Sequence, residues 1–446
     1  MNKTWKVLSN ITGILMMIPG MPVLLLGLAW IVYSCWVLVN PNPYTENAAK
    51  YGILWIVVVW LTVICGLILV TQAGASLNNR ISRPVRFPSF LILVWALIIL
   101  GVSGWMMVDT PAGGLLFPPI FFLAGVLPPL AVLTWGQPQG QQLTWRRFLL
   151  AFAIGSSLAV LLAILLEVFL PFFILTIAQG LYEQIQATAK TVLDALSGKT
   201  VSNVISSPFF IMALIELGII APLVEEFVKP LLVLPMIHNA EGRKQAFWVG
   251  ASAGAGFAAL ENLLYTGFGL NIWQGILVLR ILSAAVHPLG AGLVALGWYE
   301  VFHPDEQTGV NRRNRLVNWL GGYAPAVGIH ALWNGGSLLV FSLASTEFFG
   351  KTSAEVDIFG LTLAGISLAF LIVVGVGALM VFRSIAQQSE AQSIETLNPV
   401  SWVEQGAEMA GGAGQKSLAL WAITCLLMVL PLVISTLQVL QIGALP

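Results

Sequence analysis

Three charged side chains fall within five residues of an apolar stretch of the chain, 209–237: Glu225, Glu226 and Lys229. Ionisable groups inside a membrane-spanning segment are rare and usually functional, because burying a charge in hydrocarbon is costly. Glu225 and Lys229 are four residues apart, so on a helix they share a face and can pair, whereas Glu226 lies about 100° round. If lysine keeps one carboxylate ionised, the other can accept a proton, as a general base must.

A second polar group follows in the next apolar segment. Phe257, Glu261 and Tyr265 recur every four residues and therefore lie on one helical face, with Asn262 beside them. The small residues at 250–256 come just before this group, and small residues allow two helices to pack closely. This segment is therefore predicted to bring Glu261 close to a neighbouring helix.

Two of the chain's four histidines lie in the middle of later apolar segments. His287 comes seven residues after Arg280, so both face the same side of a helix, and the proline after His287 is expected to perturb that helix. His330 and Asn334 are four apart and also share a face. For Arg280 we expect a structural role, either neutralising a carboxylate or reaching the membrane surface.

These side chains together suit hydrolysis. A pair of glutamates can take a proton from water and pass it to a leaving amine. Histidine and asparagine can donate hydrogen bonds to the tetrahedral oxyanion, which is often the largest single contribution to catalysis.

The same residue types can also bind zinc. The candidate ligands are Glu225, Glu226, Glu261, His287 and His330. The sequence contains no His-Glu-x-x-His motif and no cluster of cysteines. We therefore expect no cofactor and keep zinc as the second interpretation.

A transporter is the alternative from another functional class, because buried glutamate, lysine and histidine also form proton relays. Transporters that couple substrate movement to protons or ions often contain internal repeats. No internal repeat is visible here, and the polar residues concentrate in one half of the chain. The sequence therefore favours an enzyme over a proton- or ion-coupled transporter.

The composition is that of a membrane protein: 58% of the 446 residues are hydrophobic and 9% are charged. Soluble domains carry about 25% charged residues. The net charge is zero, so nothing suggests a nucleic-acid partner. Segments of about 20 apolar residues predict an all-α fold, a polytopic transmembrane helical bundle of about 11 spans. The predicted spans are roughly 11–38, 52–71, 88–107, 115–135, 148–178, 209–237, 246–268, 274–302, 319–344, 358–382 and 417–440.

The connections between these spans predict the orientation. One alternate set, with the N-terminal residues, holds 14 Lys and Arg, and the other set holds four. By the positive-inside rule the N-terminus lies in and the C-terminus out. We divide the chain into an N-terminal five-span membrane region of unknown role (1–204), a four-span catalytic core (205–345) and two C-terminal spans joined by a cytoplasmic linker (346–446).

No chemistry is expected in the first 200 residues. Glu167 is the only carboxylate well inside one of the early spans. We expect its replacement by glutamine to leave activity nearly unchanged.

Four motifs, each on its own predicted span, resemble those of the PrsW-type intramembrane proteases. They are Glu225-Glu226-x-x-Lys229, Phe257-x-x-x-Glu261-Asn262, His287 followed by small residues, and His330-x-x-x-Asn334. This family belongs to the superfamily that includes the CAAX prenyl endopeptidases and bacteriocin-processing enzymes. The motifs cover roughly residues 205–345.

The resemblance implies a multi-pass protease of a bacterial or archaeal plasma membrane. Its substrate would be a membrane protein, such as an anti-sigma factor, cut within or beside a membrane helix. The resemblance further implies that Glu225 activates water with support from Glu226, and that His330 and Asn334 stabilise the oxyanion. Glu261 occupies the place of a helper histidine in the CAAX branch. The family has been described both as metal-dependent and as glutamate-dependent, so zinc stays open.

Overall fold

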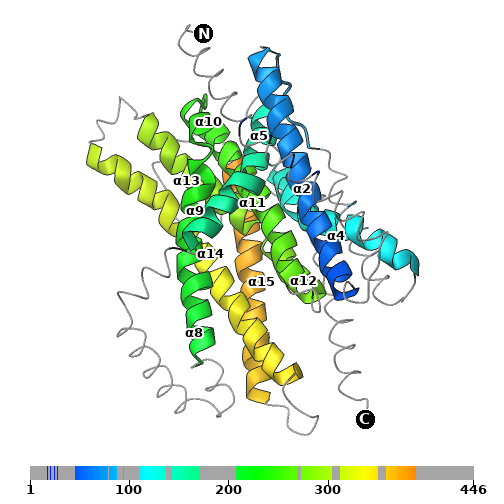
Figure 1. The fold of residues 1–446 in the computed structure, drawn as a ribbon. Coiled ribbons are helices and arrows are strands. Elements are labelled where there is room, and N and C mark those ends of the chain that lie inside the picture. The colour runs from blue at the N-terminus through cyan, green and yellow to red at the C-terminus, as the bar shows by residue number, and fades with distance from the viewer. Residues whose placement is uncertain are drawn as a thin grey trace.

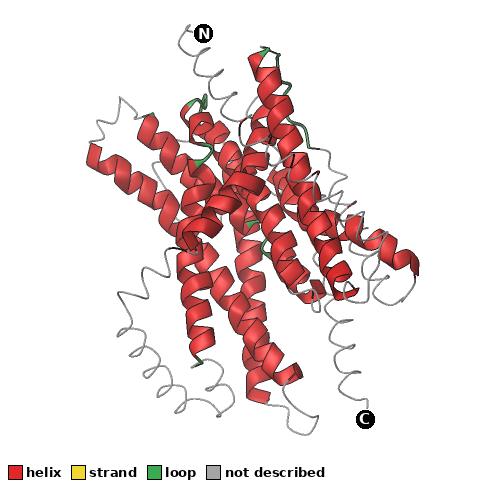
Figure 2. Ribbon diagram, viewed as in Figure 1, coloured by secondary structure: helices red, strands yellow, loops and turns green. Residues whose placement is uncertain are grey.

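The computed structural model describes most of the chain's helical segments (Figure 2). The described residues are 46–78, 80–87, 111–136, 143–167, 207–268, 273–303, 312–349 and 358–387, with single positions at 18, 21, 25, 28, 94 and 169. Within these ranges the regular elements are all helices, and Pro84 and Thr144 form one isolated β-bridge. The predicted all-α class is confirmed.

Three of the described helices are long and apolar enough to cross a membrane. They cover Trp145–Glu167, Leu279–Phe302 and Gly365–Gln387, and each coincides with a predicted span. Helices also occupy five other predicted spans: α2 (Glu46–Leu77), α4 (Pro111–Gly136), α8 with α9 (Pro208–Ile215 and Ala221–Leu231), α11 (Arg243–Phe268) and α14 (Arg312–Phe349).

The other predictions about the membrane topology are not tested by the described residues. The spans predicted at 11–38, 88–107 and 417–440 lie outside the described residues except for isolated positions. The total of about 11 spans, the orientation of the termini and the three-part division of the chain therefore stay predictions.

Helix α11 runs through the middle of the described bundle (Figure 1). It packs against α2, α4 and α5 (Trp145–Ile154) on one side and against α13 (Val286–Phe302) on the other. Helix α13 in turn packs against α14, which packs against α15 (Ile358–Gln387). This order places the polar faces of α9, α11, α13 and α14 around one shared interior.

The small residues of α11 allow this close packing. A Cβ atom added at Gly254 would overlap the backbone carbonyl of His287, and one added at Gly256 would overlap that of Phe152. Glycine is therefore required where α11 meets both α13 and α5. The packing role predicted for the small residues of 250–256 is confirmed.

The segment that carries Glu225 is interrupted. A π-helical turn, η3 (Glu216–Ile220), separates α8 from α9. The Ala221 N–H donates to the Glu216 carbonyl, and Pro222 has no N–H to offer. Neither residue that would normally donate to the Leu217 carbonyl is available, so this carbonyl needs a partner from another helix. The Nδ2 group of Asn334 supplies it at 2.9 Å.

The chain also breaks just before His287. Helix α12 (Trp273–Leu282) ends, a turn follows, and α13 begins at Val286. Pro288 lies in the first turn of α13, where a missing backbone N–H costs nothing. The predicted perturbation of this helix is therefore a break on the N-terminal side of His287.

Candidate active site

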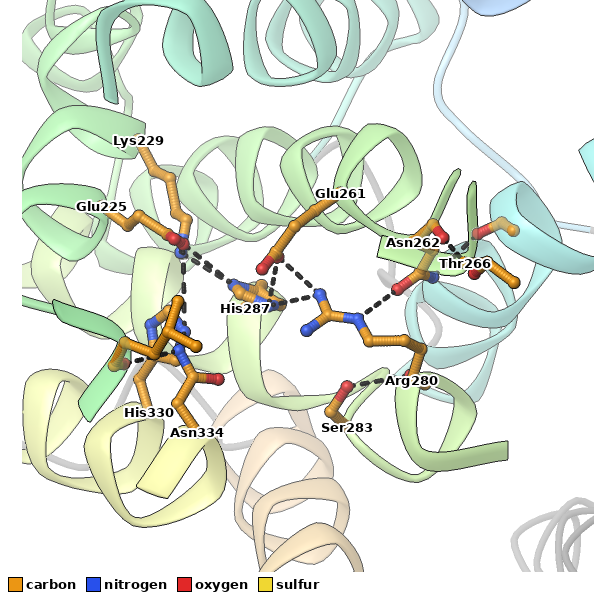
Figure 3. Close-up of polar contacts among 12 residues, drawn as sticks. Glu225, Lys229, Glu261, Asn262, Thr266, Arg280, Ser283, His287, His330 and Asn334 are labelled. Atoms are coloured by element: carbon orange, nitrogen blue, oxygen red, sulfur yellow. Dashed lines mark hydrogen bonds and ion pairs between the residues drawn. The ribbon is translucent and has the colours of Figure 1, made fainter. Parts of the chain in front are cut away.

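The Lys229 ammonium lies at the centre of the site (Figure 3). Its Nζ atom is 2.7 Å from Glu226 Oε1, 3.0 Å from Glu225 Oε2 and 2.8 Å from His287 Nδ1. The side chain of Lys229 is fully buried, and it also lies over the ring of Phe257. The predicted pairing of Glu225 with Lys229 is confirmed, and the same lysine also pairs with Glu226.

His330 is fixed by a partner on each side of its ring. Its Nδ1 lies 2.9 Å from Glu226 Oε1, and its Nε2 lies 3.1 Å from Asn334 Nδ2. An amide nitrogen only donates, so Nε2 of His330 accepts and Nδ1 carries the proton that is donated to Glu226. The second amide hydrogen of Asn334 goes to the Leu217 carbonyl. Asn334 thus joins the interrupted helix to His330.

His287 is held in the same manner. Its Nε2 lies 2.8 Å from Glu261 Oε2, and its Nδ1 accepts from Lys229. Arg280 Nη2 also lies 2.5 Å from Glu261 Oε2. Because Nε2 of His287 carries the hydrogen donated to Glu261, its 3.2 Å contact with Arg280 Nη2 joins two donors and is not a hydrogen bond. The imidazole lies between Lys229 on one side and Glu261 with Arg280 on the other (Figure 3).

Arg280 ties this part of the site to the rest of the bundle. Its Nε donates to Asn262 Oδ1 at 2.9 Å, and Asn262 Nδ2 donates to the Gly125 carbonyl of α4 at 2.9 Å. With its ion pair to Glu261, Arg280 has the role of neutralising a buried carboxylate. This confirms the structural role expected for it.

Each histidine therefore gives one N–H to a carboxylate and keeps an acceptor nitrogen on the inner side. These acceptors, His287 Nδ1 and His330 Nε2, each lie 3.9 Å from Glu225 Oε2. The ligand atoms of the three residues all lie within 4.8 Å of one another, so they form a possible metal-binding triad. Carboxylates bonded to the outer nitrogens are typical of metal-binding histidines. Of the five candidate ligands, Glu226 and Glu261 lie outside this triad and hold its histidines.

A cavity of about 170 Å³ adjoins Glu225. It is lined by Val160, Ala163, Ile164, Glu167, Glu225, Phe257, Glu261, Leu264 and Tyr265. The predicted face of Phe257, Glu261 and Tyr265 thus forms one wall. Glu225 lines the cavity and the adjacent Glu226 does not, so only the first of the two glutamates faces space that water or a substrate can fill.

Glu167 lies in a place that the sequence did not indicate. It lines the cavity together with Glu225 and Glu261, although no chemistry is expected before residue 200. Its isolation as a carboxylate within an apolar span was the available signal. The expectation that Glu167→Gln leaves activity nearly unchanged stays a prediction, and the position of Glu167 in the cavity wall counts against it.

The order and geometry of these groups agree with one known family. A family described as PrsW family intramembrane metalloprotease matches residues 144–376, about half of the chain. The chain belongs to the PrsW family. It is therefore a membrane protein and a protease, which makes it a peptidase and a hydrolase. No curated protein and no solved structure matches the chain.

The PrsW match is wider than the four motifs. It begins at Thr144, so it includes the Trp145–Glu167 helix, and it extends into α15. The resemblance drawn from the motifs is confirmed, and the transporter alternative is not favoured.

The description of the PrsW family as a metalloprotease implies a bound metal ion. The triad has donors of a suitable type and number for such an ion. Two neutral imidazole nitrogens and a carboxylate oxygen are a usual ligand set for zinc. Lys229, however, lies 3.0 Å from Glu225 Oε2 and 2.8 Å from His287 Nδ1. A metal and the ammonium would therefore compete for the same two donor atoms.

Proposed function

We propose that this PrsW-family protein is an intramembrane endopeptidase in which Glu225 activates water without a metal. One observation carries this proposal: Glu225 both pairs with Lys229 and lines the cavity, whereas Glu226 is enclosed. The lysine ammonium supplies the positive charge beside the reacting carboxylate. The positive charge next to Glu225 is thus a side chain of the protein itself.

The reaction follows from this placement. Glu225 Oε2 takes a proton from a water in the cavity while the water oxygen attacks the carbonyl carbon of the scissile peptide. Glu225 then returns that proton to the nitrogen of the leaving amine as the C–N bond breaks. The charge of Lys229, directly behind Glu225, stabilises both the carboxylate before attack and the oxyanion after it.

The other polar residues have positioning roles in this proposal. Glu226 holds Lys229 and His330, and Glu261 holds His287. The oxyanion role predicted for His330 and Asn334 requires a donor directed at the cavity. Asn334 donates both of its amide hydrogens, one to the Leu217 carbonyl and one to His330. We therefore assign positioning to the His330–Asn334 pair. Lys229 acts on the oxyanion through its charge and not through a hydrogen bond, because its three ammonium hydrogens go to Glu225, Glu226 and His287.

A zinc-dependent protease is the second candidate, and the two inner acceptor nitrogens favour it. Glu225, His287 and His330 would hold the metal. Lys229 would have to leave the first two, and the Asn334 amide would have to leave Nε2 of His330. A bound metal would polarise the scissile carbonyl and lower the pKa of a water molecule. In that case Glu225 would be a ligand and not the base.

The proposed setting follows from family and burial. We place the protein in the plasma membrane as a multi-pass protein in contact with the lipid bilayer. The proposed substrate is a membrane protein, such as an anti-sigma factor. Support comes from the position of the site among apolar helices.

The test is Glu225→Gln, which keeps the size of the side chain and removes its ability to accept a proton. Cleavage of reporter transmembrane segments by the purified protein should fall by about 10²–10⁴-fold, the usual contribution of a general base. Glu241→Gln makes the same chemical change at an exposed position and should cleave normally. Thermal unfolding of both variants checks that they fold. Normal cleavage by folded Glu225→Gln would refute the proposal.

A further inference from the structure

The cavity beside Glu225 combines apolar walls with acidic groups from three different helical segments. Glu167 comes from the Trp145–Glu167 helix, Glu225 from α9 and Glu261 from α11. The apolar walls are formed by Val160, Ala163, Ile164, Phe257 and Leu264. A long side chain with an apolar stem and a polar end would match this lining.

The acidic groups have unused acceptor atoms. Glu261 is 5% exposed, and its Oε1 has no hydrogen-bond partner among the described residues, since His287 and Arg280 both contact Oε2. Glu167 Oε1 is also buried without a partner. A buried carboxylate oxygen without a donor is unfavourable. These two oxygens therefore lack donors, and a guest that donates hydrogen bonds would supply them.

The formal charges at the site also favour a positively charged guest. Four carboxylates and two cations meet at the site within the described residues: Glu167, Glu225, Glu226 and Glu261 with Lys229 and Arg280. Both cations are already paired with other carboxylates, Lys229 with Glu225 and Arg280 with Glu261. With neutral histidines, negative charge is in excess, and an enclosed excess of one sign favours a guest of the opposite sign.

Glu167 differs from the other two carboxylates of the cavity in its ionic contacts. It forms no ion pair among the described residues, whereas Glu225 and Glu261 each have one. Its electrostatic neighbours include two more carboxylates, Glu216 and Glu261, opposed by Lys229. Glu167 is therefore free to bind a guest without disturbing the groups assigned to the chemistry.

We propose that this cavity is a substrate subsite that receives a lysine or arginine side chain next to the scissile bond, with Glu167 determining this specificity. The proposal rests on the proposed function, because it names a side chain of the peptide that is cut. The methylene stem would pack on the apolar walls. The cationic end, which only donates hydrogen bonds, would meet the free oxygens of Glu167 and Glu261.

A binding measurement tests the subsite independently of catalysis. The full-length protein in detergent is heated with N-acetyl-lysine amide or with N-acetyl-norleucine amide, which differ in the terminal charge. At about ten times the dissociation constant the lysine probe should raise Tm by about 1–2 °C, and the norleucine probe should raise it less. Glu167→Gln should abolish this difference, and the surface control Glu241→Gln should keep it. Equal shifts for the two probes, or a difference that survives in Glu167→Gln, would overturn the proposal.

A cleavage measurement then connects the subsite to the reaction. Reporter transmembrane segments carry lysine or glutamine at each position beside the cut. The wild-type protein should prefer lysine at one position by about tenfold in kcat/KM, and Glu167→Gln should bring that ratio to about one. Cleavage without a lysine preference would refute the subsite and leave the protease proposal intact. Selective lysine binding without cleavage of any reporter would support the subsite and count against the protease proposal.

Discussion

Two carboxylate–histidine pairs lie beside Glu225, and they differ in the groups that surround each of them. Glu226 and His330 join α9 to α14, and Glu261 and His287 join α11 to α13. In each pair the histidine gives one N–H to the carboxylate, at 2.9 Å and 2.8 Å respectively.

The two pairs differ in the cation that is bonded to the carboxylate of each. Lys229 is bonded to Glu226 of the α9–α14 pair and points inward, where it also contacts Glu225 and His287. Arg280 serves the α11–α13 pair and extends outward to Asn262. Glu261 lines the cavity, whereas Glu226 is fully buried and does not line it. In the proposed reaction, the α9–α14 pair thus supports Glu225 through Lys229, and the carboxylate of the α11–α13 pair forms part of the cavity wall.

Removal of the inward cation should have the largest effect. Lys229→Met leaves Glu225 and Glu226 buried without a counter-charge, so the free energy of unfolding should fall by about 3–5 kcal/mol. Thermal and denaturant unfolding in detergent measure this. Arg243→Met breaks the surface pair with Glu300 and should cost less than about 1 kcal/mol. Similar losses for the two variants would mean that Lys229 is not the centre of the site.

A smaller effect is expected at Gly290, where α13 presses against Glu226. A Cβ atom at this position would overlap Glu226 Oε2. Gly290→Ala should therefore displace Glu226, lower stability by about 1–3 kcal/mol and reduce cleavage. At Gly328, on the helix that carries His330, no atom lies within 4 Å of the added carbon. Gly328→Ala should unfold at the wild-type temperature or above it; equal losses at the two positions would show that crowding of Glu226 is not the cause.

Asn334 offers a test of the link between the interrupted helix and His330. Asn334→Ala leaves the Leu217 carbonyl without its donor and should cost about 1–3 kcal/mol. Because His330 also loses the group that orients Nε2, kcat should fall more than KM changes. A variant as stable and active as the wild type would show that water replaces the amide, and the positioning role would be withdrawn.

The smallest effect is expected for Tyr323→Phe. The Tyr323 hydroxyl donates to the Leu223 carbonyl at 2.6 Å and ties α14 to α9 near the α9–α14 pair. Its removal should lower stability by about 0.5–1.5 kcal/mol, the usual net value of one hydrogen bond, and leave cleavage largely intact. Unfolding and cleavage assays on the same preparation measure both. A large loss of cleavage without a loss of stability would give Tyr323 a role in the reaction that the present account lacks.

Local spacing predicted a substantial part of the site. The Glu225–Lys229 pair, the shared face of Phe257 and Glu261, and the contact of His330 with Asn334 all follow from helical periodicity. Such relations need only the geometry of a single helix, which the sequence carries directly.

Relations between helices were not predictable in the same way. Lys229 contacts His287 across 58 residues, and Glu167 reaches the cavity from a span outside the predicted core. Both depend on where glycines such as Gly254 allow helices to meet, which hydropathy does not reveal. The need of the Leu217 carbonyl for Asn334 depends on a π-helical turn, and a single sequence gave no sign of that turn.

The central claim is that a lysine ammonium, and not a metal ion, supports the reacting Glu225. The most direct test is to quantify bound metals in the purified full-length protein and to measure reporter cleavage before and after chelation. The account predicts that metal-free protein cleaves the reporter at the untreated rate. Stoichiometric zinc that is lost together with activity, and restores it when added back, would contradict the account and make Glu225, His287 and His330 its ligands.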